Sequence, residues 1–280
     1  EKFVEGPVVV EMPARDFSSP EDFGDALASA LRDAVAPFKW TGVVGVAVTR
    51  RVASALGLPD LSYSRLARTL NPIFERANVV GSFVHTTIHA EAAGYAELAT
   101  EAGKDFAVTA RTDGDATWRQ QVLVATLGES LGAVLFNDGH RVRRTGLNTM
   151  VTARWMPSKM HDNTPLADAW RSVGWPNPIV PEIGSEGWED YGRLADRYVL
   201  DLVKLARPDR VVLVPTGPAG TMESFVEHLK PLLKLSQAAA EKKGFVIESG
   251  PPPQYAIVKG AALAALVELR AVGAQLTMRQ

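Results

Sequence analysis

The sequence predicts an α/β protein made of two halves, each with helices packed against a sheet. Three features support this prediction. The run from 43 to 48 contains only valine, alanine and glycine, which is typical of a strand buried on both faces of a parallel sheet. Stretches with apolar residues at helical spacing alternate with such strands near both ends of the chain. A polar break between Gly103 and Thr117 separates the two halves.

Composition excludes several classes of protein. The 280 residues are 46% hydrophobic and 22% charged, as in an ordinary globular chain. The net charge of -2 provides no general attraction to nucleic acids or acidic membranes. No apolar run is long enough to span a membrane, and the chain has no cysteine for disulfides or thiolate metal sites. We therefore expect a soluble protein; a reducing compartment, the cytoplasm or an organelle interior, is favoured, although the compartment stays open.

The elements of the first half follow from capping residues and periodicity. Residues 8–10 are expected to form a short strand. Ser18-Ser19-Pro20 supply a hydroxyl cap and a proline for the first turn of a helix that should end before Pro37. The elements expected next are strand 43–48, helix 64–76, strand 82–87, and a helix over 88–102 capped by Gly103.

The second half should begin with antiparallel strands. Strands 121–127 and 132–136 flank a glycine-containing turn, and Asn137-Asp138-Gly139 is typical of a tight hairpin turn before residues 140–142. The stretch from 155 to 181, rich in proline and tryptophan, should be irregular. The remaining elements alternate again: a helix with an apolar stripe from Trp188 to Leu205, strand 210–215, helix 221–235, strand 245–248 and helix 257–272.

The peptide from Thr126 to Gly132 is the strongest local candidate for ligand binding. Glycine permits positive φ and close backbone approach, so successive N–H groups can point at a phosphate, while hydroxyl groups add donors. A plain tight turn is the alternative, because glycine at strand ends is common. The candidate phosphate-binding residues are Thr126, Gly128, Ser130 and Gly132.

Several peptides occur in the order in which a family of sugar kinases has them. They are WTGVVGV from Trp40, AEAAGYAE from Ala90, TLGESLG from Thr126, WEDY from Trp188 and IVKGAA from Ile257. Over about residues 8 to 270 the chain resembles polyphosphate glucokinases of the ROK group, within the actin and hexokinase superfamily. The resemblance implies two RNase-H-like α/β domains with an interdomain cleft.

The resemblance also implies where the domains lie. The N-terminal domain would cover 1–103, with helix 257–272 packing back on it, and the C-terminal domain would cover 104–256. The family's first phosphate hairpin, D-x-G-G-T, has no counterpart, because residues 1–10 resemble only the strand that follows it. The chain begins at Glu1 without a signal-peptide pattern, so we expect this hairpin to be either truncated or lost.

The chain departs from the family where the chemistry is expected. A gapless alignment on residues 90–94 places Ile88 on the asparagine that holds the sugar and His89 on the catalytic aspartate. Neutral histidine can accept a proton, but loss of the neighbouring asparagine argues against a simple exchange of base. Gly146 and Thr149 replace two further sugar ligands. An alignment shifted by two residues also supplies no aspartate.

The site for the phosphoryl donor is altered as well. In place of the family's glycine-rich turn, residues 215–220 keep Gly217 and Gly220 but add prolines, which lack N–H donors. Glu129 adds a negative charge to the other turn. We therefore expect Gly217, Gly220 and the Thr126–Gly132 turn to be vestigial donor-binding elements.

These departures predict a catalytically degenerate sugar-kinase-like protein, a pseudokinase that acts as a structural or binding subunit. Its partners would be other protein subunits or copies of itself, with no nucleic acid and no membrane insertion, and no cofactor is expected. The alternative is an active kinase that phosphorylates glucose or a related hexose from polyphosphate or ATP with Mg²⁺, with His89 as the base.

Three other groups of residues have mainly structural explanations. His85 and His89 straddle a predicted junction of strand and helix, so no metal site is expected. Arg141 and its two neighbouring arginines, at 143 and 144, should form a solvated strand edge, with contact to phosphate or polyphosphate as the alternative. The tryptophans between 155 and 188 should pack in the core or between domains, with a protein interface as the alternative.

Overall fold

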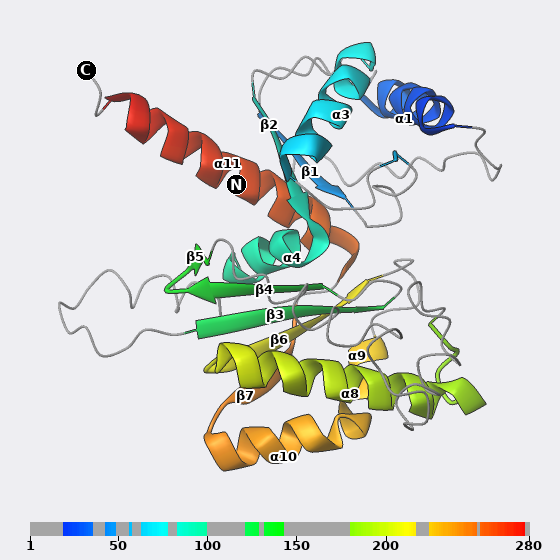
Figure 1. The fold of residues 1–280 in the computed structure, drawn as a ribbon, viewed down its shortest axis with the longest axis vertical. Helices are drawn as coiled ribbons and strands as arrows, with labels where there is room; N and C mark the ends of the chain where they lie inside the picture. Colours follow the sequence, from blue (N-terminus) through cyan, green and yellow to red (C-terminus); the bar gives the residue numbers. More distant parts are fainter. Residues whose placement is uncertain are drawn as a thin grey trace. The chain divides into compact units, whose positions relative to one another are not determined.

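The computed structural model describes residues 19–35, 43–48, 56–57, 63–77, 83–99, 121–128, 132–142, 180–216, 224–250 and 253–277. The chain divides into two compact units (Figure 1). One unit comprises residues 1–88 and 261–280, and the other comprises residues 89–260. Each unit is described separately below.

In its described residues, the first unit contains two parallel strands, two complete helices and the part of a third helix from Ala261 onward. Helix α1 (Pro20–Val35) begins where the sequence predicted, and the Ser19 hydroxyl accepts the Asp22 N–H at 3.1 Å as an N-cap. Strand β1 (Val43–Val48) pairs in parallel with β2 (Phe83–Ile88). Helix α3 (Tyr63–Arg76) packs against α1 and β2. The predicted helices and the parallel pairing of this region are confirmed.

The two faces of strand β1 are used differently. Alternate side chains, Val44, Val46 and Val48, belong to a core shared with α1 and α3. Gly45 lies on the opposite face, against the backbone of Ala261 in helix α11 (Pro253–Thr277): a Cβ at position 45 would lie 2.0 Å from the Ala261 carbonyl oxygen. The glycine of the WTGVVGV peptide is therefore explained by close packing of a helix on the strand.

The second unit is built on a mixed sheet, of which five strands lie in the described residues. Its order is β5-β4-β3-β6-β7. Strand β3 (Gln121–Gly128) pairs antiparallel with β4 (Gly132–Asn137) and parallel with β6 (Arg210–Thr216). Strands β5 (His140–Arg141) and β7 (Val246–Ser249) form the two ends of this order. The predicted change from antiparallel to parallel pairing is confirmed.

The hairpin between β4 and β5 has the predicted turn. Asp138 and Gly139 have φ angles of 50° and 74°. Two successive positive φ values are characteristic of the tight turns that match the twist of paired strands. The turn brings Arg141 opposite Phe136 in the sheet, a position that matters for the site described below.

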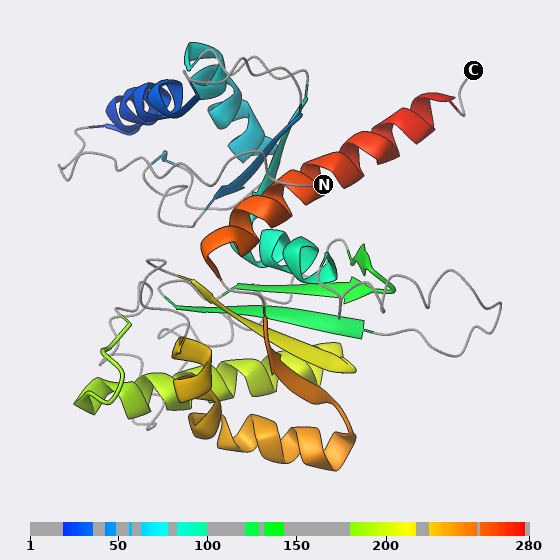
Figure 2. The ribbon, with the colours of Figure 1, turned by 180° about the vertical axis from the view of Figure 1, so that it is seen from behind.

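Helices cover both faces of this sheet, as Figures 1 and 2 show. Helix α4 (His89–Leu98) lies on one face, and α8 (Glu186–Ala206) lies on the other. On the α8 face, Leu123 and Leu213 join a core with Tyr191, Tyr198 and Leu202. Because both faces are covered, the central strands are apolar at nearly every position, as the sequence predicted for a buried sheet.

The single helix predicted over residues 221–235 is wrong. The structure has α9 (Phe225–Leu229), a 3₁₀ turn, η3 (Lys230–Leu232), and then α10 (Lys234–Lys243). Pro231 lacks the N–H that a continuous helix needs. A new helix starts there because the Asp196 carboxylate of α8 accepts the N–H groups of Leu235 and Ser236, each at 2.8 Å.

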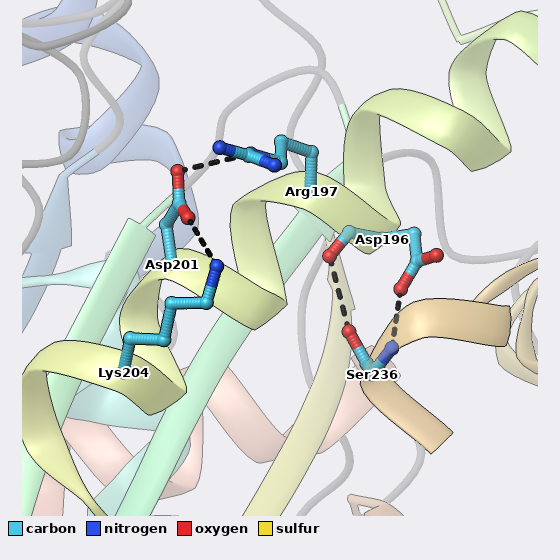
Figure 3. A network of polar contacts seen from close by, with 5 residues as sticks. All are labelled: Asp196, Arg197, Asp201, Lys204 and Ser236. Carbon is cyan, nitrogen blue, oxygen red and sulfur yellow. Dashed lines mark hydrogen bonds and ion pairs between the residues drawn. The ribbon is translucent and has the colours of Figure 1, made fainter. Parts of the chain in front are cut away.

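Figure 3 shows the hydrogen bonds and ion pairs made by polar side chains of α8. The Ser236 hydroxyl donates to the Asp196 carbonyl at 3.0 Å, completing the link between α8 and α10. Further along α8, the buried Asp201 carboxylate lies between two cations. Arg197 Nε is 3.3 Å from its Oδ2 atom, and Lys204 Nζ is 3.7 Å from its Oδ1 atom. Both buried aspartates of this helix are thus paired, as burial requires.

The division into units places α4 and the first residues of α11 with the second unit. The domain limits that the resemblance implies, 1–103 with helix 257–272 and 104–256, stay a prediction. None of the helices in the described part of the chain has the length and apolar character needed to cross a bilayer.

Candidate functional site

His89, the candidate base, is the first residue of α4. Strand β2 ends at Ile88 and the helix begins directly after it. Every residue from Ala90 to Glu97 is buried, so the helix is fixed in the protein along most of its length. The catalytic role that the resemblance implies for position 89 stays a prediction, but its place at the start of a buried helix is established.

Burial determines the protonation state of His89. It lowers the pKa of the imidazole to about 4, because a positive charge is disfavoured away from water. The ring is therefore neutral at pH 7. Its Nδ1 atom is buried and has no hydrogen-bond partner among the described residues. A neutral imidazole can accept a proton, but burial makes the resulting cation energetically unfavourable.

The turn between β3 and β4 is partly described. Thr126 is 1% exposed and pairs with Gly132 across the two strands. A Cβ at position 132 would lie 2.5 Å from the Thr126 hydroxyl oxygen, so packing alone requires glycine there. Gly128 ends β3 with a φ of 148°, in the region that favours glycine, and its carbonyl accepts the Tyr191 hydroxyl at 3.3 Å.

The start of α4 lies beside these strands. A Cβ at Gly132 would lie 3.3 Å from the Cβ of Ala90, the residue after His89. The structure therefore brings the beginning of α4 close to Thr126 and Gly132 within the second unit. The other predicted donor residues, Ser130, Gly217 and Gly220, lie outside the described residues, as do the replaced sugar ligands Gly146 and Thr149.

A buried ion pair close to His89 was missed by the sequence analysis. Glu91 is fully buried, and Arg141 Nη1 of β5 lies 2.6 Å from its Oε1 atom. The prediction that Arg141 is a solvated edge residue is therefore wrong, because the hairpin carries its side chain to α4. The available signal was Glu91 itself, since an acid within an alanine-rich helix needs a cation when the helix is buried.

A second buried pair holds the other end of α4. Arg210 Nη2, at the start of β6, lies 2.7 Å from Glu97 Oε1. Arg210 also contacts the Glu248 carboxylate of β7. Burial is the largest influence on Glu97 and raises the pKa of its carboxyl, while Arg210 opposes this shift. Arginines from two different strands thus anchor α4 to the sheet.

Close packing explains two further glycines of the peptides that carry the resemblance. A Cβ at Gly94 would lie 2.1 Å from the Phe136 ring of β4, which also meets Tyr95 edge-on at 5.4 Å. A Cβ at Gly260 in α11 would lie 1.7 Å from the Ala92 carbonyl oxygen. The sequence match in these peptides therefore follows from how α4 packs, independently of any reaction.

A metal site is not formed by the part of the chain that the structure describes. His85 lies within β2 and His89 begins α4. No group of three or more histidine, aspartate or glutamate side chains able to hold a metal gathers among the described residues. Trp188, one of the tryptophans predicted to be structural, is buried in the core, stacked on Tyr191 at 5.9 Å.

Comparisons with solved structures identify the fold. The inorganic polyphosphate/ATP-glucomannokinase from Arthrobacter sp. strain KM matches with a TM-score of 0.53 and 18% identity, over 95% of this chain and 90% of that chain. The Lmo2764 protein of Listeria monocytogenes, provisionally named an N-acetylmannosamine kinase, matches with a TM-score of 0.51 and 16% identity, over 88% and 87%. The ROK hexokinase from Thermus thermophilus has a TM-score of 0.49, 18% identity, and coverage of 94% and 91%.

The first two of these neighbours, with TM-scores above 0.5, carry the names of sugar kinases. The α/β fold of the actin, hexokinase and ROK proteins, expected from the resemblance, is confirmed. At this level of identity the likeness concerns the fold alone. No protein-family model matches the sequence, and no curated protein matches it.

Proposed function

We propose that this protein keeps the fold of ROK sugar kinases but has lost phosphoryl transfer, and that it serves as a structural or binding subunit. One observation carries the proposal: the first residue of α4, where the resemblance expects a catalytic aspartate, is a partly buried histidine whose pKa is lowered to about 4. An aspartate loses its charge on accepting a proton, whereas this imidazole gains a charge that burial opposes.

The expected effect on catalysis is large. A well-placed general base contributes about 10² to 10⁴ to the rate. Ile88 and His89 together replace both polar residues that the resemblance expects at this junction. In contrast, the ion pairs and close glycine contacts that hold α4 are intact. Replaced residues at the expected catalytic position, together with preserved packing contacts, are what we expect of a protein that keeps its fold without the reaction.

Mg²⁺ would accompany ATP or polyphosphate if the chain were active. Such an ion takes most of its ligands from phosphates and water. The described residues assemble no set of three acidic or histidine ligands, and an ion held mainly by the phosphates of the donor and by water does not need such a set. No step is assigned to it.

The test is a phosphorylation assay with glucose and mannose, using polyphosphate and ATP as separate donors with Mg²⁺. These substrates follow from the Arthrobacter glucomannokinase, which shares the fold. We expect no turnover above background. Turnover of the order of 1 s⁻¹, which is ordinary for kinases, would contradict the proposal. The double variant Ile88→Asn with His89→Asp measures how much of the defect lies at this junction.

Activity with His89 as the base is the second candidate. The neutral imidazole, with Nδ1 lacking a hydrogen-bond partner among the described residues, supports it. Under this alternative, His89→Ala abolishes turnover. The matched control is His228→Ala, which removes an exposed histidine of α9, and this change should leave turnover unaffected.

The binding role predicts a partner subunit or a second copy of the chain. Val258, Val267 and Leu269 of α11 are exposed, at 57%, 42% and 37%, and apolar side chains of this kind are suited to protein contacts. Light scattering and crosslinking of the purified protein, and of the variant Val258→Glu with Leu269→Glu, test this part. A monomer that captures no partner, unchanged in the variant, would contradict it.

A further inference from the structure

Three buried aromatic side chains of the second unit contact one another. Trp188 and Tyr191 lie one turn apart on α8, and their rings stack at 5.9 Å. Phe225, the first residue of α9, meets the Trp188 ring edge-on at 5.5 Å and the Tyr191 ring edge-on at 5.8 Å. Edge-on and stacked rings at such distances attract one another. The three rings therefore form one packed group, called the aromatic triad below.

Tyr191 also makes a polar contact with the end of β3. Its hydroxyl donates to the Gly128 carbonyl at 3.3 Å, across 63 positions of the chain. Burial raises the pKa of this hydroxyl above its ordinary value of 10, so the group keeps its proton at neutral pH. A buried hydroxyl needs an acceptor, because leaving it unpaired costs free energy. The hydrogen bond therefore ties Gly128 to the aromatic triad.

Gly128 is a position whose backbone conformation must be selected by its surroundings. Its φ is 148°, and glycine can adopt many other values. Gly128 is paired with Thr216 in the sheet, so β3 and β6 end side by side. Helix α9, which begins at Phe225, packs against β6. The aromatic triad thus contacts the end of β3 through Tyr191 and the start of α9 through Phe225.

We propose that Tyr191 is a positioning residue that couples the end of β3 to the start of α9. Its hydroxyl selects the conformation of Gly128, and its ring makes that conformation depend on the packing of Phe225. A change at Gly128, caused by a ligand at the β3–β4 turn or by a substitution, is then transmitted to α9, and the reverse. The coupling does not depend on phosphoryl transfer, since His89 takes no part in it.

The proposal also gives a reason for the WEDY peptide, which the proposed function leaves unexplained. Its tryptophan and tyrosine, Trp188 and Tyr191, are three positions apart and so lie on the same face of α8. Both are members of the aromatic triad, whereas Asp190 between them pairs with Arg193 at the surface. The two aromatic residues of the peptide therefore serve the coupling.

The first experiment compares the full chain with Tyr191→Phe, which keeps the ring and removes the hydroxyl. We expect the ¹³C resonance of the Gly128 carbonyl to shift upfield as its hydrogen bond is lost, and the amide resonance of Phe225 to shift with it. The unfolding equilibrium constant should rise about fivefold. Tyr198→Phe, which removes the hydroxyl of another fully buried tyrosine of α8, is the matched control and should leave both resonances in place.

A Gly128 carbonyl resonance that stays in place in Tyr191→Phe would overturn the proposal, whatever the change in stability. A shift of this resonance without one at Phe225 would overturn the coupling and leave only a local hydrogen bond. Because the ring is kept, this variant loses little packing, and the two outcomes can be distinguished in the folded protein.

The second experiment tests the coupling from the other end. Phe225→Leu removes a ring from the aromatic triad without changing Gly128 or Tyr191. We expect the Gly128 carbonyl resonance to move in the same direction as in Tyr191→Phe. In urea unfolding, the double variant should lose less stability than the sum of the two single variants, as contacting residues do when they depend on each other. Additive losses with an unmoved Gly128 resonance would refute the coupling. Should Phe225→Leu not fold, Phe225→Met takes its place with the same expectation.

Discussion

Residues 86–89 and residues 91–97 follow each other in the chain but bury their polar groups in opposite ways. In the first stretch, Thr86 Oγ1 and His89 Nδ1 are buried without a hydrogen-bond partner among the described residues. In the second stretch, both acids are paired with arginines, Glu91 with Arg141 and Glu97 with Arg210. Folding alone therefore accounts for the acids of the second stretch, whereas no contact among the described residues accounts for Thr86 Oγ1 and His89 Nδ1 of the first.

The comparison separates residues that maintain the fold from residues at the position where the resemblance expects chemistry. The peptide from Ala90 to Glu97 is similar to the corresponding peptide of the kinase family because its glycine and its two acids are needed for α4 to pack against the sheet. Among the described residues, Thr86 Oγ1 and His89 Nδ1 have no such partner, and at Ile88 and His89 the chain departs from the pattern that the resemblance implies. A close match in such a peptide is thus a sign of fold and says little about activity.

The largest expected effect is the loss of stability when the cation that contacts Glu97 is removed. Arg210→Met keeps an apolar stem of similar length but leaves Glu97 and Glu248 without their cation. Breaking a buried pair in this way costs about 3 to 5 kcal/mol, so we expect a loss of that size in urea unfolding at pH 7. The loss should shrink at lower pH, where the acids can be protonated.

The control for this change is Arg193→Met on α8. Arg193 is 68% exposed and pairs with Asp190 at the surface, where such a pair contributes about 0 to 1 kcal/mol. Equal losses in the two variants would mean that burial of Arg210 has no special importance, and the contrast between the two stretches would fail.

Acidification should destabilise the folded protein through His89. The expected direction is opposite to that for Glu97, because the pKa of His89 is lowered by folding and that of Glu97 is raised. The pKa of His89 is lowered from 6.5 to about 4 on folding, so the unfolded state binds more protons between these values. Stability due to this group is present above pH 6.5 and is lost as the pH falls to 4, by about 3 kcal/mol. Unfolding of wild type and His89→Leu, measured between pH 7 and pH 4, isolates this contribution.

In His89→Leu this part of the acid destabilisation should be absent. The variant His228→Asn, which removes an exposed histidine, serves as control and should keep the wild-type slope. If His89→Leu also keeps it, His89 is solvated in the folded protein, and the main support for the proposed loss of catalysis disappears.

Gly94→Ala tests whether packing explains the family-like peptide. The new methyl group would overlap the Phe136 ring, which is 1% exposed and has no room to move, at a cost of about 1 to 3 kcal/mol. Gly24→Ala in α1 is the control: its nearest neighbour would be 3.4 Å away, so the better helix propensity of alanine should stabilise by up to about 1 kcal/mol. Combining Gly94→Ala with Phe136→Leu should restore part of the loss.

Much of the fold could be predicted from the sequence because its signals are local. The cap at Ser19, the apolar run of β1 and the turn at Asp138-Gly139 act over a few residues, and these elements lie where they were expected. The break at Pro231 was missed because the cap that restarts the helix comes from Asp196, 40 residues before Ser236.

The candidate site was less predictable for the same reason. His89 could be identified from its place in a family-like peptide, but its burial depends on the whole unit. Arg141 appeared to be a surface residue because its partner, Glu91, is 50 positions away in the chain. Pairings at this distance depend on tertiary structure and leave no periodic trace in the sequence.

The smallest expected effect concerns Thr86, whose side chain lies in β2 at 5% exposure. If its hydroxyl has no partner, as holds among the described residues, Thr86→Val replaces an unsatisfied polar group with a methyl group and should stabilise the protein by about 1 kcal/mol. Thr86→Ser keeps the hydroxyl but removes a buried methyl group, so it should be destabilising. Thermal and urea unfolding of the two variants give these signs. A loss of stability in Thr86→Val would show that the hydroxyl is bonded within the folded chain, and that residues 86–89 are constrained by folding as strongly as residues 91–97.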